Sequence, residues 1–137
     1  MRNKVIVIGC GRLGANIANI ASEKGQNVLV IDYNENAFDR LPDSFSGYKV
    51  VGDATDLSIL EESYIKTAKE IIIATGNDNV NLFLAHVAHI LYEVPSIFVR
   101  LDDPERGSLL SGMKIKAIYP FELSMNKFNL MKGEDLL

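Results

Sequence analysis

The sequence predicts a Rossmann-type α/β fold, a doubly wound parallel sheet of six strands in a single domain. Short β-branched runs alternate with longer helical patterns along the 137 residues, which is typical of consecutive strand and helix units. Several of these runs, such as 5–8 and 71–74, are apolar at nearly every position, as in strands that helices cover on both faces. By analogy with other doubly wound folds, we expect the strand order 3-2-1-4-5-6.

The expected helices and strands are bounded by residues that begin or end regular structure. Gly25 follows the first helix as a C-terminal stop, Asp56 can cap the third helix, and Pro104 lies where a first helical turn tolerates proline. We expect strands at residues 4–9, 27–32, 48–51, 70–75, 96–101 and 117–119. We expect helices at residues 12–24, 35–41, 57–64, 79–92, 105–111 and 122–131.

The composition excludes several classes of protein. A hydrophobic fraction of 47% indicates a folded domain rather than a disordered chain. There are 18 acidic and 14 basic residues, a net charge of -4, which disfavours binding to nucleic acid. The single cysteine, Cys10, excludes an intrachain disulfide. The first apolar run is too short for a signal sequence or a membrane span, so we expect a cytoplasmic protein.

The strongest motif is a glycine-rich turn between the first strand and the first helix, Gly9-Cys10-Gly11-Arg12-Leu13-Gly14. Gly9 permits the tight turn, Gly11 lets a diphosphate approach the backbone, and Gly14 lets the helix pack closely on the strand. The N-terminus of the helix then offers free N–H groups and a partial positive charge to the phosphates.

An acidic residue stands where such a site needs one, because Asp32 ends the second strand 18 residues after Gly14. Its carboxylate can accept hydrogen bonds from ribose hydroxyls. It would repel a 2′-phosphate, which disfavours NADP and favours NAD(H), ATP, ADP or AMP. In the alternative interpretation the glycines only form a turn and Asp32 only caps the next helix.

Polar clusters also follow the third, fourth and fifth strands. They are Gly52-Asp53-Ala54-Thr55-Asp56, the segment from Thr75 through Gly76 and Asp78 to Asn81, and Arg100. Open α/β sheets bind ligands at the carboxyl ends of their strands, near the point where the strand order reverses. These clusters therefore favour a ligand at that edge, although turns and helix caps have the same composition.

The patterns of several enzyme classes are absent. No lysine lies four residues after any tyrosine, as a short-chain reductase would require, and Met113 stands where a phosphate-binding loop ending at Gly112 needs lysine. His86 and His89 are spaced to share a helical face but have no accompanying metal-ligand motif, which favours packed or interface histidines. Cys10 is better explained as a small spacer than as a redox sensor. We therefore expect no catalytic residue and no metal site.

The ordered set of motifs resembles the RCK/KTN (TrkA-N type) nucleotide-binding domain of Trk and Ktr potassium-uptake regulatory proteins, over nearly the whole chain. The residues that carry the resemblance are Gly9-x-Gly11-Arg12-x-Gly14, Asp32, Gly52-Asp53-Ala54-Thr55, Ala74-Thr75 to Asn81, Arg100 and Tyr119-Pro120. The ordered set is specific, although each motif alone is common.

The resemblance implies a role for each matching position. The glycine-rich turn with Arg12 would hold phosphates, Asp32 the ribose, and Asp53 with Ala54 the adenine, while Thr75, Asp78 and Arg100 would line the rest of the cleft. Arg12 could meet a terminal phosphate or a neighbouring subunit, or it is a solvated arginine. The complete expected set is Gly9, Gly11, Arg12, Leu13, Gly14, Asp32, Tyr33, Gly52, Asp53, Ala54, Thr55, Thr75, Gly76, Asp78 and Arg100.

The function that the resemblance implies is regulation rather than catalysis. It predicts a cytoplasmic subunit, peripheral to the membrane, that gates a potassium channel or transporter in response to NAD(H) or ATP/ADP. The implied partners are a membrane subunit that translocates K+ and further copies of the chain, as dimers that assemble into a ring. The alternative is a small NAD-dependent oxidoreductase or one half of a split dehydrogenase. A redox-sensing transcription regulator is disfavoured by the acidic charge.

We expect residues 1–120 to form the nucleotide-binding domain and residues 121–137 to form a helix and tail. Phe121, Met125 and Phe128 recur at helical spacing after the sheet should already be covered. They would contact a partner chain or pack back on their own domain. Members of the family commonly carry a second, smaller ligand-binding domain. Here that domain is a separate polypeptide, or the regulator has one domain, or the sequence is a shortened one.

Overall fold

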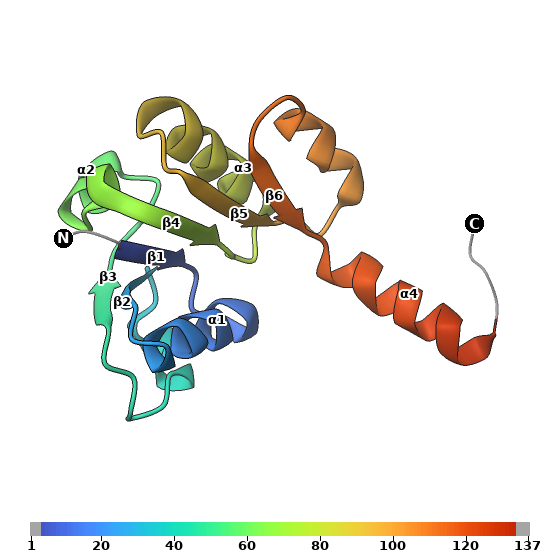
Figure 1. The fold of residues 1–137 in the computed structure, drawn as a ribbon, viewed down its shortest axis with the longest axis horizontal. Coiled ribbons are helices and arrows are strands. Elements are labelled where there is room, and N and C mark those ends of the chain that lie inside the picture. Colours follow the sequence, from blue (N-terminus) through green and yellow to red (C-terminus); the bar gives the residue numbers. More distant parts are fainter. Residues whose placement is uncertain (1–3, 134–137) are drawn as a thin grey trace.

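One parallel sheet organises the part of the chain that the computed structural model describes, residues 4–133 (Figure 1). Its six strands lie in the order β3-β2-β1-β4-β5-β6, and every neighbouring pair is parallel. The predicted fold class and strand order are therefore confirmed. The strands are β1 (Lys4–Ile8), β2 (Asn27–Asp32), β3 (Tyr48–Val51), β4 (Ala68–Ile73), β5 (Ser96–Arg100) and β6 (Ile115–Ile118).

Two strands begin earlier than the sequence predicts. β4 starts at Ala68, because Ala68 already pairs with Lys4 of β1, and the register shifts after this pair. β6 starts at Ile115, where it pairs with Ile97 of β5. The exposed Lys114 and Lys116 lie on either side of Ile115, so the sequence has no continuous apolar run where this edge strand begins.

Helices of three kinds connect the strands of the described residues. They are the α-helices α1 (Arg12–Glu23), α2 (Leu57–Glu62) and α3 (Asp78–His86), the 3-10 helices η1 (Glu35–Arg40), η2 (Ile65–Thr67) and η4 (Pro104–Leu110), and the π-helix η3 (Val87–Leu91). A further α-helix, α4 (Pro120–Lys132), follows the last strand. The predicted helices at 35–41 and 105–111 are thus short 3-10 helices, and the one predicted at 79–92 changes from α to π geometry at Val87. The predicted stop at Gly25 and the predicted helix starts at Asp56 and Pro104 are confirmed, since Gly25 follows α1 with a φ of 79°, Asp56 caps the N-terminus of α2 and Pro104 opens η4.

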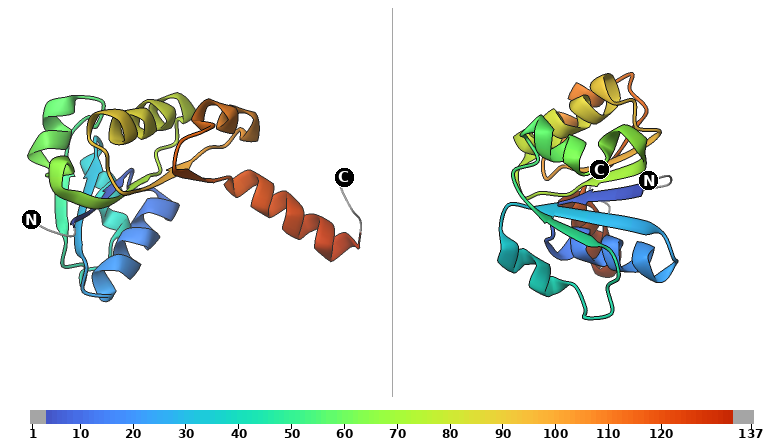
Figure 2. Two further views of the ribbon diagram at one scale, coloured as in Figure 1. Left: turned by 45° about the horizontal axis from the view of Figure 1, so that its top comes forward. Right: turned by 90° about the vertical axis from the view of Figure 1, so that its left-hand side faces the viewer.

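Helices cover both faces of the sheet, as the apolar strands predict (Figure 2). Alternate residues of each central strand point to opposite faces. The face under α1 and η1 contains Val5, Val7, Val28, Val30 and Ile72. The other face, under α2 and α3, contains Ile6, Ile8, Leu29, Ile31, Ile71 and Ile73. The sheet therefore separates two apolar cores.

The last helix, α4, runs away from the sheet instead of covering it (Figures 1 and 2). Its large apolar side chains are exposed, including Phe121 at 64% and Leu130 at 77%. The structure therefore does not contain the back-packing that was one of the two expectations for this segment. Within residues 4–133, none of the helices combines the length and the hydrophobicity that a membrane span requires.

A buried lysine, Lys4, begins the central strand β1. It lies at the amino-terminal ends of the strands, whereas the predicted ligand site is at their carboxyl ends. Lys4 has no exposed surface, and its Nζ has no hydrogen-bond partner among the described residues. The ammonium lies over the rings of Tyr48, 4.8 Å from the ring centroid, and Tyr64, at 5.3 Å. Burial nevertheless lowers the pKa of Lys4, so the two rings replace only part of the lost hydration.

We expect the substitution Lys4→Met to stabilise the protein at neutral pH, with a gain that shrinks as the pH rises. The pKa of Lys4 is lower in the folded protein than in the unfolded chain, so near neutral pH burial of the charged ammonium lowers the free energy of unfolding. As the pH rises, the folded protein loses this proton before the unfolded chain does, and the loss of stability is progressively removed. The measurement is the free energy of unfolding of both proteins in urea from about pH 7 to about pH 10. A difference that does not change with pH would show that the ammonium remains solvated in the folded protein.

Candidate functional site

A cleft of about 810 Å³ opens at the carboxyl ends of the strands. It lies where the strand order reverses between β1 and β4, and its volume is within the range of small-molecule sites. Segments that follow β1, β2, β3 and β4, together with the end of β5, line it. The lining residues are Ile8, Gly9, Cys10, Gly11, Ile31, Asp32, Tyr33, Asn34, Ala37, Arg40, Gly52, Asp53, Ala54, Thr55, Ala74, Thr75, Gly76, Asn77, Val80 and Arg100.

The three glycines of the first turn differ in what a side chain would meet. Gly9 has a φ of 96°, and a Cβ there would lie 2.6 Å from the carbonyl oxygen of Ala74. A Cβ at Gly14 would lie 1.8 Å from the carbonyl oxygen of Gly9. Gly11 differs, because a Cβ there would meet nothing within 4 Å. Packing therefore explains Gly9 and Gly14, whereas at Gly11 a Cβ would extend into space that no protein atom occupies.

Asp32 connects the glycine-rich turn to the end of β2. One carboxylate oxygen accepts the backbone N–H of Cys10 at 2.8 Å, and the other accepts the N–H of Asn34 at 2.8 Å. A carboxylate has about four acceptor positions, so Asp32 keeps capacity for further donors in the cleft. Burial and the neighbouring Asp32 carboxylate raise the pKa of the Cys10 thiol, which keeps the thiol protonated and poorly reactive at neutral pH.

The turn after β3 forms another wall of the cleft. The backbone N–H of Gly52 donates to the carbonyl of Asp32 at 3.0 Å, which holds this turn beside the end of β2. Asp53 accepts the hydroxyl of Thr55 at 2.7 Å and its backbone N–H at 2.9 Å, and these bonds lower the pKa of Asp53. The buried Ala54 lies between them in the chain. The turn is therefore a preformed part of the cleft.

The side chain of Asn81, from α3, makes hydrogen bonds to Thr75, which follows β4, and to Arg100, which ends β5. Its side chain is fully buried. Its Oδ1 accepts the backbone N–H and the hydroxyl of Thr75. Its Nδ2 donates to the carbonyl of Thr75 at 3.0 Å and to that of Arg100 at 2.8 Å. The whole amide is satisfied, so it holds Thr75 and the backbone of Arg100 in one arrangement.

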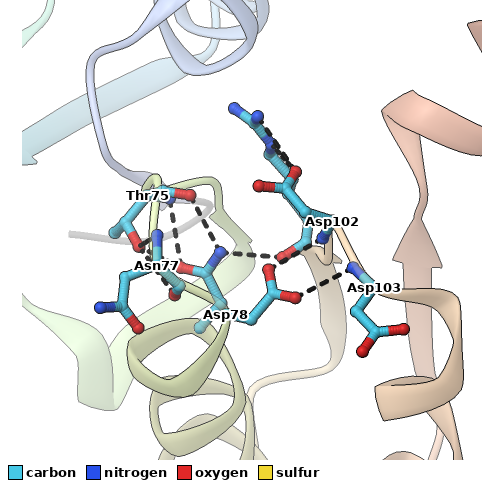
Figure 3. A network of polar contacts seen from close by, with 7 residues as sticks. Thr75, Asn77, Asp78, Asp102 and Asp103 are labelled. Carbon is cyan, nitrogen blue, oxygen red and sulfur yellow. Dashed lines mark hydrogen bonds and ion pairs between the residues drawn. The ribbon is translucent and has the colours of Figure 1, made fainter.

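Asp78 makes a second connection between the same two segments (Figure 3). Its carboxylate accepts the backbone N–H groups of Asp102 at 2.8 Å and Asp103 at 3.0 Å. Asp78 therefore faces the loop after β5 and is not among the residues that line the cleft. Arg100 does line the cleft, and its guanidinium donates to the carboxylate of Asp102.

Most of the expected site residues come together around the cleft, and four of them lie outside its lining. Arg12 is exposed on the first turn of α1, Leu13 packs against the core under α1, and Gly14 contacts Gly9. Asp78 is the fourth, as described above. The expected residues in the lining are Gly9, Gly11, Asp32, Tyr33, Gly52, Asp53, Ala54, Thr55, Thr75, Gly76 and Arg100.

The cleft also contains residues that the sequence did not indicate, of which Arg40 is the most informative. It comes from the end of η1 and lines the cleft together with Asn34 and Ala37. Nothing in the linear sequence pairs Arg40 with the glycine-rich turn, because only the fold of η1 brings it there. Asn81 was visible as part of a polar cluster, but its buried bonds to two strands were not.

Within residues 4–133, histidine, cysteine and acidic side chains do not gather in a group that could hold a metal ion. His86 instead places its Nδ1 2.7 Å from the carbonyl oxygen of Leu82, one turn earlier on the same helix.

The sheet, the glycine-rich turn and Asp32 together define a Rossmann-type nucleotide-binding fold. The family model of the TrkA-N domain matches residues 5–120. The chain belongs to the TrkA-N domain family, as its motifs predicted. It is 32% identical over 114 residues to the Trk system potassium uptake protein TrkA of Streptomyces coelicolor, a match that covers 83% of this chain and 51% of that protein. The chain spans about half the length of the curated relatives it matches.

Solved structures show the same fold. The TrkA-N domain of the inner membrane protein ybaL from Escherichia coli has a TM-score of 0.80 at 17% identity, over 96% of this chain and 98% of that one. The GsuK channel bound to NAD has a TM-score of 0.78 at 26% identity, over 95% of this chain and 23% of that one. The ADP-bound form of GsuK matches with a TM-score of 0.79 at 26% identity, over 97% and 35% of the two chains.

We expect Asn81→Ala to lower the free energy of unfolding by about 2–4 kcal/mol, because it leaves buried backbone groups of Thr75 and Arg100 unpaired and opens a cavity. Asn36→Ala is the control for the loss of an asparagine amide, because Asn36 is exposed and only its backbone N–H makes a hydrogen bond, to Asn34; its effect should stay within about 0.5 kcal/mol. Urea unfolding of both variants gives the comparison. Equal effects of the two substitutions would show that the Asn81 bonds contribute no net stability.

Proposed function

We propose that this chain is a non-catalytic regulatory domain of a potassium transport system, and that its cleft binds an adenine nucleotide. The observation that carries the proposal is Gly11. Its missing Cβ keeps clear a space beside the N-terminus of α1 that no protein atom occupies, and this is where a diphosphate would meet free N–H groups. The sequence similarity to potassium uptake proteins supports a role in potassium transport.

The residues of the cleft fit such a ligand. Gly9, Gly11 and the first turn of α1 would hold the phosphates, and Asp32 has acceptor capacity for ribose hydroxyls. The turn from Gly52 to Thr55 would lie against the adenine, with Tyr33 beside it. Arg100 and Thr75 line the part of the cleft on β4 and β5, where anionic groups would find a cation.

The proposed ligands are NAD(H), ATP, ADP or AMP, which share the adenosine half that these residues would contact. The NAD-bound and ADP-bound forms of the related GsuK channel support this set. The carboxylate of Asp32 disfavours the 2′-phosphate of NADP. Arg12 is exposed and lies outside the cleft lining. It would contact either a terminal phosphate that extends beyond the cleft or a residue of a neighbouring subunit.

Regulation requires that the nucleotide bind one state of the assembly more tightly than another. A ratio of about 100 between the two affinities would supply roughly 2.7 kcal/mol. We propose that copies of this chain form dimers, that the dimers assemble into a ring, and that the ring lies on the cytoplasmic side of a membrane subunit that translocates K+. The states would then differ in how the copies are arranged within the ring.

The exposed side chains of α4 support the proposal that residues 121–137 assemble copies of the chain. Phe121, Leu123, Leu130 and Met131 are each more than 60% exposed, and the helix lies apart from the sheet (Figure 1). Apolar surface of this kind is usually covered by another protein chain.

We expect Gly11→Ala to weaken nucleotide binding by about tenfold or more, roughly 1.4 kcal/mol, without destabilising the fold. The φ of Gly11 is -81°, which alanine adopts freely, so the added methyl acts only on the ligand. Titration calorimetry with NADH, NAD, ATP, ADP and AMP measures binding, and urea unfolding measures stability.

Asp32→Ala should also weaken binding, but it removes two hydrogen bonds of the fold as well. Asp39→Ala is its control, because Asp39 is exposed and lies outside the cleft lining. Unchanged affinity in both Gly11→Ala and Asp32→Ala would contradict the proposed site. Turnover of NAD by the purified protein with a small substrate would instead favour the oxidoreductase alternative.

We expect Leu123→Glu combined with Leu130→Glu to dissociate the oligomer into folded monomers, because charges would be buried in the proposed contact. Light scattering measures the mass and circular dichroism the fold. Ile20→Glu is a matched control, since Ile20 is an exposed apolar residue of α1. A wild-type protein that stays monomeric at high concentration would contradict the role of α4.

A further inference from the structure

We propose that Asp102 is a specificity-determining residue of the cleft. Its carboxylate competes with the phosphates of a bound nucleotide for the guanidinium of Arg100, so that the cleft discriminates between nucleotides by whether anionic charge reaches Arg100. This inference rests on the proposed nucleotide site and adds to it a residue that does not line the cleft.

The geometry of the ion pair carries the proposal. Nε and Nη2 of Arg100 both lie 3.2 Å from the same oxygen of Asp102. These two nitrogens form one edge of the guanidinium, and an edge of this kind can donate two parallel hydrogen bonds to a phosphate or a carboxylate. Asp102 therefore occupies hydrogen-bonding positions that a phosphate in the cleft would use.

Hydrogen bonds hold the backbone of both Arg100 and Asp102, so the exchange of Asp102 for a phosphate involves side chains alone. The N–H of Asp102 donates to Asp78 at 2.8 Å (Figure 3), and the carbonyl of Arg100 accepts Nδ2 of Asn81 at 2.8 Å. Asp78 and Asn81 both belong to α3. Arg100 can therefore exchange Asp102 for a phosphate by rotating its side chain, without moving the loop.

The position of Arg100 determines which nucleotides would be affected. Asp32 ends β2 and Arg100 ends β5, with β1 and β4 between them. Three strand spacings separate these two residues by roughly 14 Å. A nucleotide whose ribose is held at Asp32 must therefore extend past the glycine-rich turn to reach Arg100. A triphosphate is long enough and anionic at its far end, whereas AMP ends at its first phosphate.

The expected size of the effect follows from solvent exposure. The side chain of Arg100 is 29% exposed and that of Asp102 is 53% exposed. Ion pairs this open to water are weak, so the competition should change affinity by about two- to fivefold. An effect of this size is enough to rank ligands that bind the same cleft.

The test compares Asp102→Asn with Asp103→Asn, two substitutions that remove the same charge from adjacent positions. Asparagine at 102 keeps the backbone N–H that donates to Asp78 and removes the charge that holds Arg100. Asp103 pairs with Arg106 instead, at 3.9 Å, and asparagine can replace it as the cap of η4. Calorimetric titration with ATP and with AMP is carried out on both variants and on the wild-type protein, after thermal unfolding confirms that each is folded.

We expect Asp102→Asn to tighten ATP binding by about two- to fivefold, to leave AMP binding unchanged, and to lose its effect when Arg100 is also replaced by glutamine. Asp103→Asn should behave like the wild type. Equal tightening by both variants would indicate a general charge effect and overturn the inference, as would no change or an equal change for ATP and AMP. Those results leave the proposed nucleotide site standing if Gly11→Ala weakens binding. Absence of binding to the wild-type protein overturns both.

Discussion

Three backbone segments meet at the carboxyl end of β1 with no side chain between them. The turn at Gly9 lies against Ala74 after β4, and α1 enters at Gly14 against the carbonyl of Gly9. A Cβ at either glycine would overlap backbone atoms, which cannot move aside as the end of a flexible side chain could. This contact sets the position of α1 on the sheet, and with it the position of Gly11, which precedes α1 and lines the cleft.

The opposite wall of the cleft is held by polar side chains instead. Asn81 bonds to both Thr75 and Arg100, while Asp78 holds the loop after β5 through two backbone N–H groups. The first wall of the cleft is therefore held by close backbone contacts, and the second by hydrogen bonds from the side chains of Asn81 and Asp78. The second wall contains the Arg100–Asp102 ion pair, so the charge that a ligand would meet there depends on a side chain outside the cleft.

The segment after β5 also connects the cleft with the last helix. It begins at Arg100 in the cleft and continues as η4, where Gly107 lies against the hydroxyl of Tyr119; a Cβ at Gly107 would be 2.1 Å from that oxygen. Tyr119 is the residue that precedes α4. The chain segment that starts in the cleft therefore contacts the residue from which α4 begins. A change at the cleft that moves this segment would also move the start of α4, which is one way in which a bound nucleotide could favour one assembled state.

The sequence by itself determined the class of fold, the strand order and the family, because apolar strands and the glycine-rich turn are local patterns with few structural solutions. It also indicated Asp32 and the polar turns, since the ends of parallel strands meet at one edge. Only the tertiary structure brought Arg40 into the cleft, turned Asp78 toward the loop after β5, and buried Lys4 beneath Tyr48 and Tyr64. These arrangements depend on contacts between residues distant in the chain, which no local pattern encodes.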